Sequence, residues 1–286
     1  MIKQIKATLL FFLGLFSLQT LVSQNIDKSY IDSFEDKIYV SEEGDILPYR
    51  IYIPKVDSHE KLPVLLFLHG RGESGSDNVK QFTHGGKWLF DYVTQNKPAI
   101  LILPQCPTTS YWSNVIRTED CKGKPSFVFT LNDTPTVAMQ LLQELWSQKI
   151  AEFTSIKLID EQKLYLGGIS MGGMGSIEFT RRNPGVFASV FPICGGGIID
   201  NLSKHKTTNF WFFHGLRDDI VSYHYSWNLH KLLTQEGIGS RYTLFEDANH
   251  NAWDPTIETE GILDWVFSNS IGSTSEQSLP SEDPEN

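Results

Sequence analysis

The sequence lacks a long basic run, a metal-binding pattern and an apolar stretch of membrane-spanning length. Its 286 residues include 24 Lys and Arg against 34 Asp and Glu, which gives a formal net charge of −10. Because phosphate binding requires clustered cations, this acidic balance disfavours a nucleic-acid partner. Cys and His residues do not stand at zinc-ligand spacing, so we predict neither a structural metal nor another cofactor. We also find no internal repeat and no second domain.

Cysteine is scarce, with three residues, Cys106, Cys121 and Cys194. Cys106 and Cys121 flank a polar loop, so one alternative is a disulfide between them. The other is that all three thiols stay reduced, and the sequence leaves both open. Cys194 has the surroundings of a buried thiol at a strand end.

The first 24 residues have the pattern of a secretory signal peptide. Lys3 and Lys6 precede a nearly unbroken apolar run, Ala7–Leu18, and Ser23 offers a small residue for cleavage. That run is shorter than the roughly 20 apolar residues that span a membrane. We therefore expect a cleaved signal and a secreted or periplasmic bacterial protein without a stable membrane anchor.

Residues 25–270 read as one catalytic domain, and residues 271–286 as a disordered polar tail. Hydrophobic residues make up 40% of the chain, enough for a sizeable core. Apolar strands predicted at 62–68, 99–103, 164–166, 187–193, 209–213 and 241–245 alternate with helical segments, which predicts an α/β protein with a mostly parallel sheet. Residues 37–53 are expected to add an edge hairpin.

Residues 108–131 show no periodicity and read as a long excursion. A helix capped by Asp133 or Thr134 is expected next, with Pro135 in its first turn and Val137 on its apolar face. Residues 25–36 read as a poorly ordered lead-in, and the last helix is expected at 256–269.

Residues 163–176 have the pattern of a sharp turn between a strand and a helix. They read K-L-Y-L-G-G-I-S-M-G-G-M-G-S and contain G-x-S-x-G centred on Ser170, with helical character becoming clear near Ile177. In such a nucleophile elbow the serine hydroxyl stands above the strand end. Gly168 and Gly172, without a Cβ, leave room for the close approach of strand and helix. We therefore predict Ser170 as a nucleophile.

A serine nucleophile needs a base, and the base needs an orienting acid. In elbow folds the chain order is serine, acid, histidine. Asp218 follows the predicted strand at 209–213, and His250 follows the strand at 241–245. We predict Asp218 as the acid, with its neighbour Asp219 as the alternative, and His250 as the base. His69 and His214, each before a Gly at a strand end, are expected to shape turns.

Backbone amides must also stabilise a negatively charged oxygen in such a site. The amide of Met171 lies at a helix N-terminus next to the serine, and that of Arg71 lies in the glycine-rich turn after residues 62–68. The Arg71 side chain either faces the cleft or pairs with Glu73. The candidate substrate contacts are His84, Trp112 and Trp253, of which the two tryptophans could equally pack in the core or a lid.

Six stretches of the sequence match a known family. They are F-L-H-G-R-G-E-S-G-S-D-N at 67–78, L-P-Q-C-P at 103–107, G-G-I-S-M-G-G-M-G at 167–175, P-I-C-G-G-G at 192–197, H-G-L-R-D-D-I-V at 214–221 and N-H-N-A-W-D-P at 249–255. Through them the chain resembles α/β-hydrolase-fold esterases of the feruloyl esterase and polyhydroxybutyrate depolymerase kind, including secreted proteins described as predicted peptidases or dienelactone-hydrolase-like. Ser222, where relatives often carry Pro, departs from the family at a turn.

The resemblance spans about Tyr49 to Val266. It implies an eight-stranded sheet and a triad of Ser170, Asp218 and His250. It also implies hydrolysis of small-molecule or polysaccharide esters through an acyl-enzyme, since relatives remove feruloyl or acetyl groups from plant polysaccharides. Two alternatives stand beside this one: a serine peptidase of the prolyl-oligopeptidase type, and a non-catalytic carbohydrate-binding protein. The sequence predicts no oligomeric state.

Overall fold

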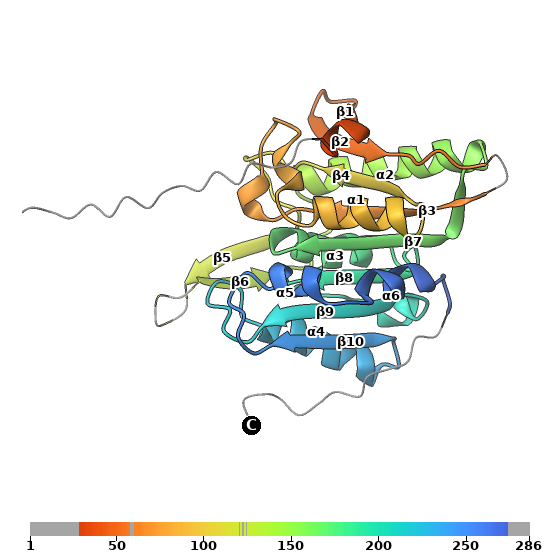
Figure 1. Cartoon of the computed structure of the whole chain (residues 1–286). Coiled ribbons are helices and arrows are strands. Elements are labelled where there is room, and N and C mark those ends of the chain that lie inside the picture. Colours follow the sequence, from red (N-terminus) through yellow and green to blue (C-terminus); the bar gives the residue numbers. More distant parts are fainter. Residues whose placement is uncertain (1–28, 58–59, 120, 122, 124, 274–286) are drawn as a thin grey trace, which may run out of the picture.

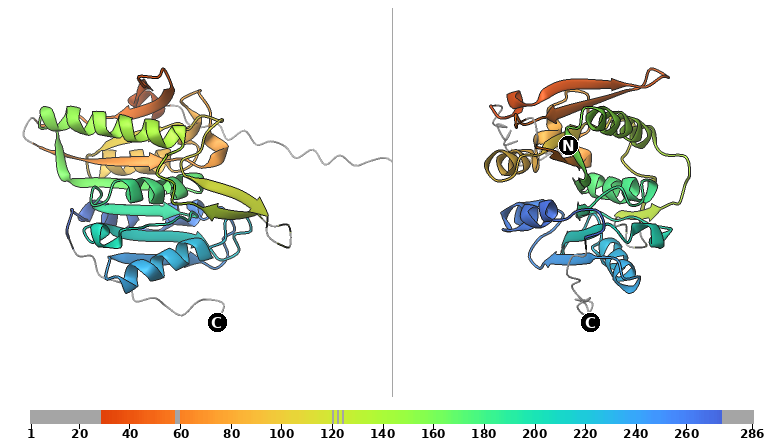
Figure 2. Two further views of the ribbon diagram at one scale, coloured as in Figure 1. Left: turned by 180° about the vertical axis from the view of Figure 1, so that it is seen from behind. Right: turned by 90° about the vertical axis from the view of Figure 1, so that its right-hand side faces the viewer.

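The computed structural model of the protein describes residues 29–57, 60–119, 121, 123 and 125–273. An eight-stranded sheet runs through its centre, with helices on both faces (Figures 1 and 2). The predicted signal peptide and residues 274–286 of the predicted tail lie outside the described residues. Within the described ranges, no helix is both long and apolar enough to cross a membrane.

The sheet contains all but two of the described strands, in the order β1-β2-β4-β3-β7-β8-β9-β10. The strands are β1 (Glu35–Val40), β2 (Ile46–Tyr52), β3 (Leu62–Leu68), β4 (Ile100–Pro104), β5 (Val115–Glu119), β6 (Pro125–Phe129), β7 (Ile159–Ile169), β8 (Ser189–Ile193), β9 (Asn209–Gly215) and β10 (Ser240–Phe245). β1 and β2 form an antiparallel hairpin at one edge, and β2 pairs antiparallel with β4. Every later pairing in the sheet is parallel. The predicted mostly parallel sheet with an edge hairpin is confirmed.

Helices cover both faces, as the continuous apolar strands require. They are α1 (Gly86–Gln95), α2 (Val137–Ser155), α3 (Met171–Arg182), α4 (His224–Gln235), α5 (Trp253–Glu258) and α6 (Ile262–Ser268). Every residue of β3 is buried, and its side chains alternate between the two faces. Leu66 and Leu68 pack in the core with α2 and α3, whereas Leu65 packs in the core with α1 and α6. Figures 1 and 2 show α1, α5 and α6 on one face and α2, α3 and α4 on the other. Two cores therefore hold the sheet in place.

Three local expectations were wrong at element ends. Residues 25–36 were expected to be poorly ordered, but Tyr30, Ile31 and Phe34 are buried against the α1 side of the sheet. The cap of α2 is Thr136, whose hydroxyl accepts from the Met139 amide, so Pro135 precedes the helix instead of lying in its first turn. Val137, expected on the apolar face of this helix, is 51% exposed.

The last predicted helix, at 256–269, is two helices. α5 ends at Glu258, and α6 begins after Gly261, whose φ of 80° is left-handed. A residue with a Cβ avoids that region, so glycine allows the turn that separates them. The division places Trp253 at the start of α5, beside His250.

The excursion at 108–131 contains a β-hairpin that the sequence did not predict. β5 and β6 pair antiparallel and project beyond the carboxyl ends of the parallel strands (Figure 1). The Tyr225 hydroxyl on α4 accepts from the Phe127 amide at 3.0 Å, and the Tyr225 ring packs edge-on against Phe127 and Phe129. These contacts hold the hairpin over the edge of the sheet where ligands bind in α/β folds.

All three thiols are free. Cys106 and Cys194 are buried and Cys121 is exposed, so the disulfide alternative between Cys106 and Cys121 is wrong. Burial raises the pKa of Cys106 to about 12, which keeps its thiol protonated and unreactive.

Two buried histidines should make stability depend on pH. Burial lowers the pKa of His230 and of His69 to about 4 each, below the ordinary value of 6.5. Between those values the unfolded chain binds more protons than the folded chain, so acidification from pH 6.5 to 5 should lower stability by up to about 1.4 kcal/mol per pH unit for each histidine. Urea unfolding across this range measures the slope. His230→Asn should flatten it, whereas His224→Asn, at a partly exposed position of α4, should leave it unchanged; equal slopes in all three proteins would contradict the prediction.

Candidate active site

Ser170 stands at the sharp turn between β7 and α3. Its φ of 54° and ψ of −113° are strained for a residue with a side chain, as an elbow requires. A Cβ on Gly172 would collide with the backbone carbonyl of Leu68, and one on Gly168 would collide with that of Gly172. The helix begins directly at Met171 rather than near Ile177. Glycines therefore allow α3 to pack against β3 and β7 and leave the serine hydroxyl above the strand end.

The structure brings the three predicted triad residues together. Ser170 Oγ lies 2.8 Å from His250 Nε2, and His250 Nδ1 lies 2.8 Å from Asp218 Oδ2. An ionised carboxylate only accepts, so Nδ1–H donates to Asp218 and Nε2 is left to accept the serine proton. The neighbouring Asp219 is exposed, and its backbone amide donates to the side chain of Asn249. The geometry selects Asp218 over Asp219 as the histidine's partner.

Asp218 is held by more than His250. Its other oxygen accepts from the amides of Ile220 and Val221 at 3.0 and 2.8 Å. His214 Nε2, which donates to the Val221 carbonyl, lies 3.3 Å from Asp218 Oδ2. Burial by itself would raise the Asp218 pKa, but the hydrogen bonds from His214 and His250 and the charge of His250 hold that pKa below its usual range. Asp218 therefore stays ionised while it orients the base.

The sequence did not predict that His214 contacts Asp218, although the His214-Gly215 pair was correctly expected to shape a turn. The ring is fully buried, with Nδ1 2.7 Å from Ser226 Oγ. The signal in the sequence was its i, i+4 spacing to Asp218. It places the two side chains at the start and the end of one tight loop.

A second histidine fixes the turn that follows β3. The Cys106 amide donates to His69 Nε2 at 2.8 Å, so Nδ1 carries the proton and donates to the Gly70 carbonyl at 2.6 Å. In a planar trans peptide the carbonyl and the next amide point in opposite directions. The hydrogen bond from His69 to the Gly70 carbonyl oxygen therefore orients the Arg71 amide away from His69. Gly70 itself lies against Ser170.

Met171 supplies the second predicted donor. It is the first residue of α3, and the first amides of a helix have no partner inside the helix. The helix dipole adds partial positive charge at this end. The start of α3 and the turn that contains Gly70 and Arg71 therefore both adjoin Ser170, where an oxyanion hole would need its two amides.

These groups open into one cavity of about 560 Å³. Its lining includes Glu73, His84 and Trp253, which adjoin one another. Tyr111, Arg117 and Phe127 also line the cavity, and the last two belong to the β5–β6 hairpin. Ser170 and His250 line the same cavity. A cavity of this size suits a small organic group or one or two sugar units.

A sequence profile of the phospholipase/carboxylesterase family matches residues 53–259, which is most of the chain and all of the site. The chain belongs to this family.

Solved structures agree with the assignment. The chain is similar to a thermostable esterase, with 31% identity over 84% of this chain and 64% of the esterase, and a TM-score of 0.71. It therefore spans less than two thirds of that protein. A ferulic acid esterase (14% identity, TM-score 0.59) and the fluorophosphonate-binding serine hydrolase FphF of Staphylococcus aureus (16%, 0.56) each align with 82% of this chain and 98% of their own. At those identities they show the fold alone, and the predicted α/β-hydrolase fold is confirmed. No curated protein matches the chain.

Two of the three predicted substrate contacts line the cavity of this carboxylesterase-family protein, and one does not. His84 and Trp253 form a wall, with their rings 4.8 Å apart. Trp112 is fully buried and packs against His69 and Gly175, so of its two predicted places the core is the one observed and the cleft is not. The signal that was overlooked is Gly175 in α3, which leaves the space that the tryptophan fills.

The side chain of Arg71 follows neither of its two predicted arrangements fully. It lines the cavity, yet its guanidinium donates to the carbonyls of Thr108 and Ser110 at 2.6 and 2.7 Å and does not pair with Glu73. Arg71 therefore links the oxyanion turn to the segment that leads into the hairpin.

Proposed function

We propose that the protein is a serine esterase that cleaves carboxylic esters through an acyl-enzyme. The observation that carries this proposal is the unbroken chain of contacts from Ser170 through His250 to Asp218, at a cavity that Ser170, His250 and Arg71 line. Family membership supports it, because it predicts carboxylic-ester chemistry.

The residues act in a definite order. His250 takes the Ser170 proton as the oxygen attacks the ester carbonyl, while Asp218 stabilises the imidazolium. The amides of Met171 and Arg71 bind the negatively charged oxygen of the tetrahedral intermediate. His250 then gives the proton to the departing alcohol. Water, activated by the same histidine, releases the acid and restores Ser170.

For the substrate, we propose feruloyl or acetyl esters of carbohydrates. The cavity has aromatic walls for an apolar ring and charged groups for hydroxyls, namely Tyr111, Phe127 and Trp253 with Glu73 and Arg117. Export would bring the enzyme to such polymers, and the basic and apolar pattern of residues 1–24 supports it. N-terminal sequencing of the protein recovered outside the cytoplasm tests this; an intact residue 1 there would count against a cleaved signal.

The decisive experiment compares three substrate types with the mature protein. Hydrolysis of p-nitrophenyl acetate and methyl ferulate, without cleavage of a peptide anilide, is the expected result. A fluorophosphonate should add covalently to Ser170, identified by mass spectrometry of the peptide. Faster cleavage of the anilide would favour a peptidase, and a folded protein that turns over none of them and takes no label would favour a binding role.

A further inference from the structure

One carboxylate in the cavity has no part in the triad. The Glu73 side chain is only 12% exposed and lies on the cavity wall, beside the oxyanion turn that contains Gly70. Its nearest charged neighbour is His84, with 3.7 Å between Oε1 and Nε2. Burial raises the pKa of Glu73, while His84 and the nearby amides of Gly70 and Glu73 oppose that rise. A buried carboxylate is costly to keep unless a partner binds it.

The same wall provides an aromatic platform. The rings of His84 and Trp253 lie 4.8 Å apart, and Trp253 meets the His250 ring edge-on at 5.8 Å. Glu73, His84 and Trp253 therefore form a continuous wall that adjoins the base; we call it the Glu73 wall.

The position of the Glu73 wall indicates which half of an ester it faces. His250 must protonate the departing alcohol, so that alcohol leaves beside the histidine. Because Trp253 is in contact with His250, the Glu73 wall faces the alcohol half. The hairpin residues Arg117 and Phe127 also line the cavity, but no contact joins them to the Glu73 wall among the described residues.

We propose that the Glu73 wall is a binding subsite for a polyhydroxylated, ring-shaped leaving alcohol, with Glu73 accepting hydrogen bonds from its hydroxyl groups. A carboxylate has two acceptor oxygens and no donor, so it selects donors. An ammonium group is disfavoured because two cationic residues, Arg71 and Arg117, are among those that line the same cavity. The apolar face of a sugar ring suits the surface formed by Trp253 and His84. This inference rests on the proposed esterase function.

The test uses two acetate esters that differ in hydroxyl groups but not in ring size. A monoacetylated methyl xylopyranoside carries donors for Glu73, whereas cyclohexyl acetate carries none. The wild type should prefer the sugar ester in kcat/KM. Glu73→Gln should lower kcat/KM on the sugar ester roughly tenfold, and Glu73→Ala roughly 100-fold, because hydrogen bonds to charged groups are the strong ones. Both variants should stay within about threefold of the wild type on cyclohexyl acetate.

The matched control is Asp254→Asn, an exposed carboxylate next to Trp253 in sequence that bonds Asn251 instead of lining the cavity. This substitution should leave kcat/KM unchanged on both esters. Equal losses of kcat/KM on both esters in the Glu73 variants would show that Glu73 only supports the oxyanion turn, and would overturn the subsite. Glu73 variants with wild-type kcat/KM on the sugar ester would overturn it as well. Failure of the wild type on p-nitrophenyl acetate would overturn the esterase proposal itself, and the subsite with it.

Discussion

Replacing Ser170 with alanine should lower kcat on p-nitrophenyl acetate by about 10⁶-fold. The hydroxyl is the atom that bonds the substrate, and His250 and Asp218 lose their function without it because the three act as one unit. A residual rate of roughly 10³-fold over water should remain, since the amides of Met171 and Arg71 still bind the charged oxygen. Single-turnover and steady-state kinetics of the purified variant measure both numbers.

Ser176→Ala is the matched control, since it removes a hydroxyl from α3, the helix that begins directly after Ser170. The Ser176 hydroxyl is buried and donates to the Gly173 carbonyl, away from the cavity. Its loss should leave kcat within a few-fold of the wild type. A Ser170→Ala protein that is folded and retains more than about a tenth of the activity would exclude Ser170 as the nucleophile.

The parts of the site that were predictable are those encoded locally. The elbow needs glycines at fixed positions around one serine, and Gly168 and Gly172 are placed where a Cβ would collide with backbone. Asp218 and His250 were found from chain order, because each follows a parallel strand and the carboxyl ends of such strands share one edge. These rules need no knowledge of distant contacts.

The parts that were missed depend on distant contacts. The β5–β6 hairpin has no strong alternation of its own, and it is held by Tyr225, about 100 residues further along the chain. For Trp112 the sequence left the cleft and the core as alternatives, and the space that Gly175 opens decides for the core. Pairings across the fold, absent from any local window, decide both cases. The division between α5 and α6 is different, because Gly261 was a readable signal that was passed over.

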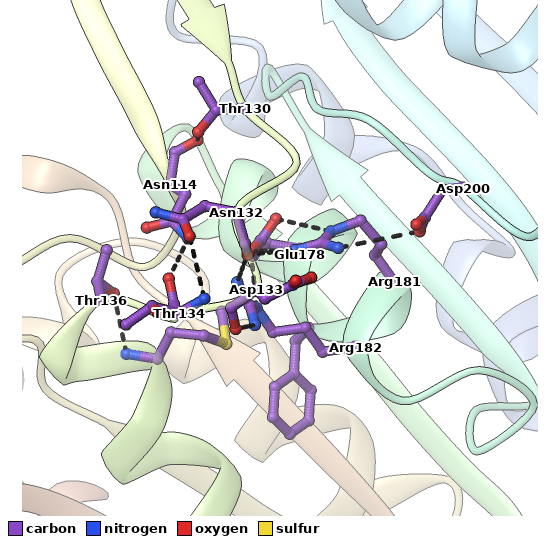
Figure 3. A network of polar contacts seen from close by, with 12 residues as sticks. Asn114, Thr130, Asn132, Asp133, Thr134, Thr136, Glu178, Arg181, Arg182 and Asp200 are labelled. Atoms are coloured by element: carbon purple, nitrogen blue, oxygen red, sulfur yellow. Dashed lines mark hydrogen bonds and ion pairs between the residues drawn. The ribbon is translucent and has the colours of Figure 1, made fainter.

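Replacing Glu178 with alanine should lower the free energy of unfolding by about 3 kcal/mol. Glu178 on α3 is 7% exposed, and its carboxylate accepts from Arg181 at 2.9 Å and from Arg182 at 2.8 Å (Figure 3). Without it, two guanidinium groups that are each less than a tenth exposed would lose their shared carboxylate. Of its described ion pairs, Arg181 would keep only a long one of 3.9 Å with Asp200. Removing one partner of a buried ion pair typically costs 3–5 kcal/mol, and the partial exposure of these arginines favours the lower end.

The loss should reach the substrate cavity as well. Arg182 donates to the carbonyls of Asn132 and Asp133 at 2.6 and 2.9 Å, so the network ties the segment after β6 to the helix that begins next to Ser170 (Figure 3). Releasing that segment should loosen the β5–β6 hairpin, whose Arg117 and Phe127 line the cavity. KM for methyl ferulate should therefore rise more than kcat falls, because the triad lies on other elements.

Thermal and urea unfolding measure the predicted loss, which corresponds to a fall in Tm of roughly 6–12 °C for a domain of this size. Glu152→Ala on α2 is the control, since that carboxylate is 51% exposed and pairs with Lys149 at the surface. Such a pair contributes about 1 kcal/mol or less. If Glu178→Ala cost no more than Glu152→Ala, the network would be an ordinary surface ion pair. Its contact with the hairpin would then have no bearing on the cavity, and the hairpin would depend on Tyr225 for its position.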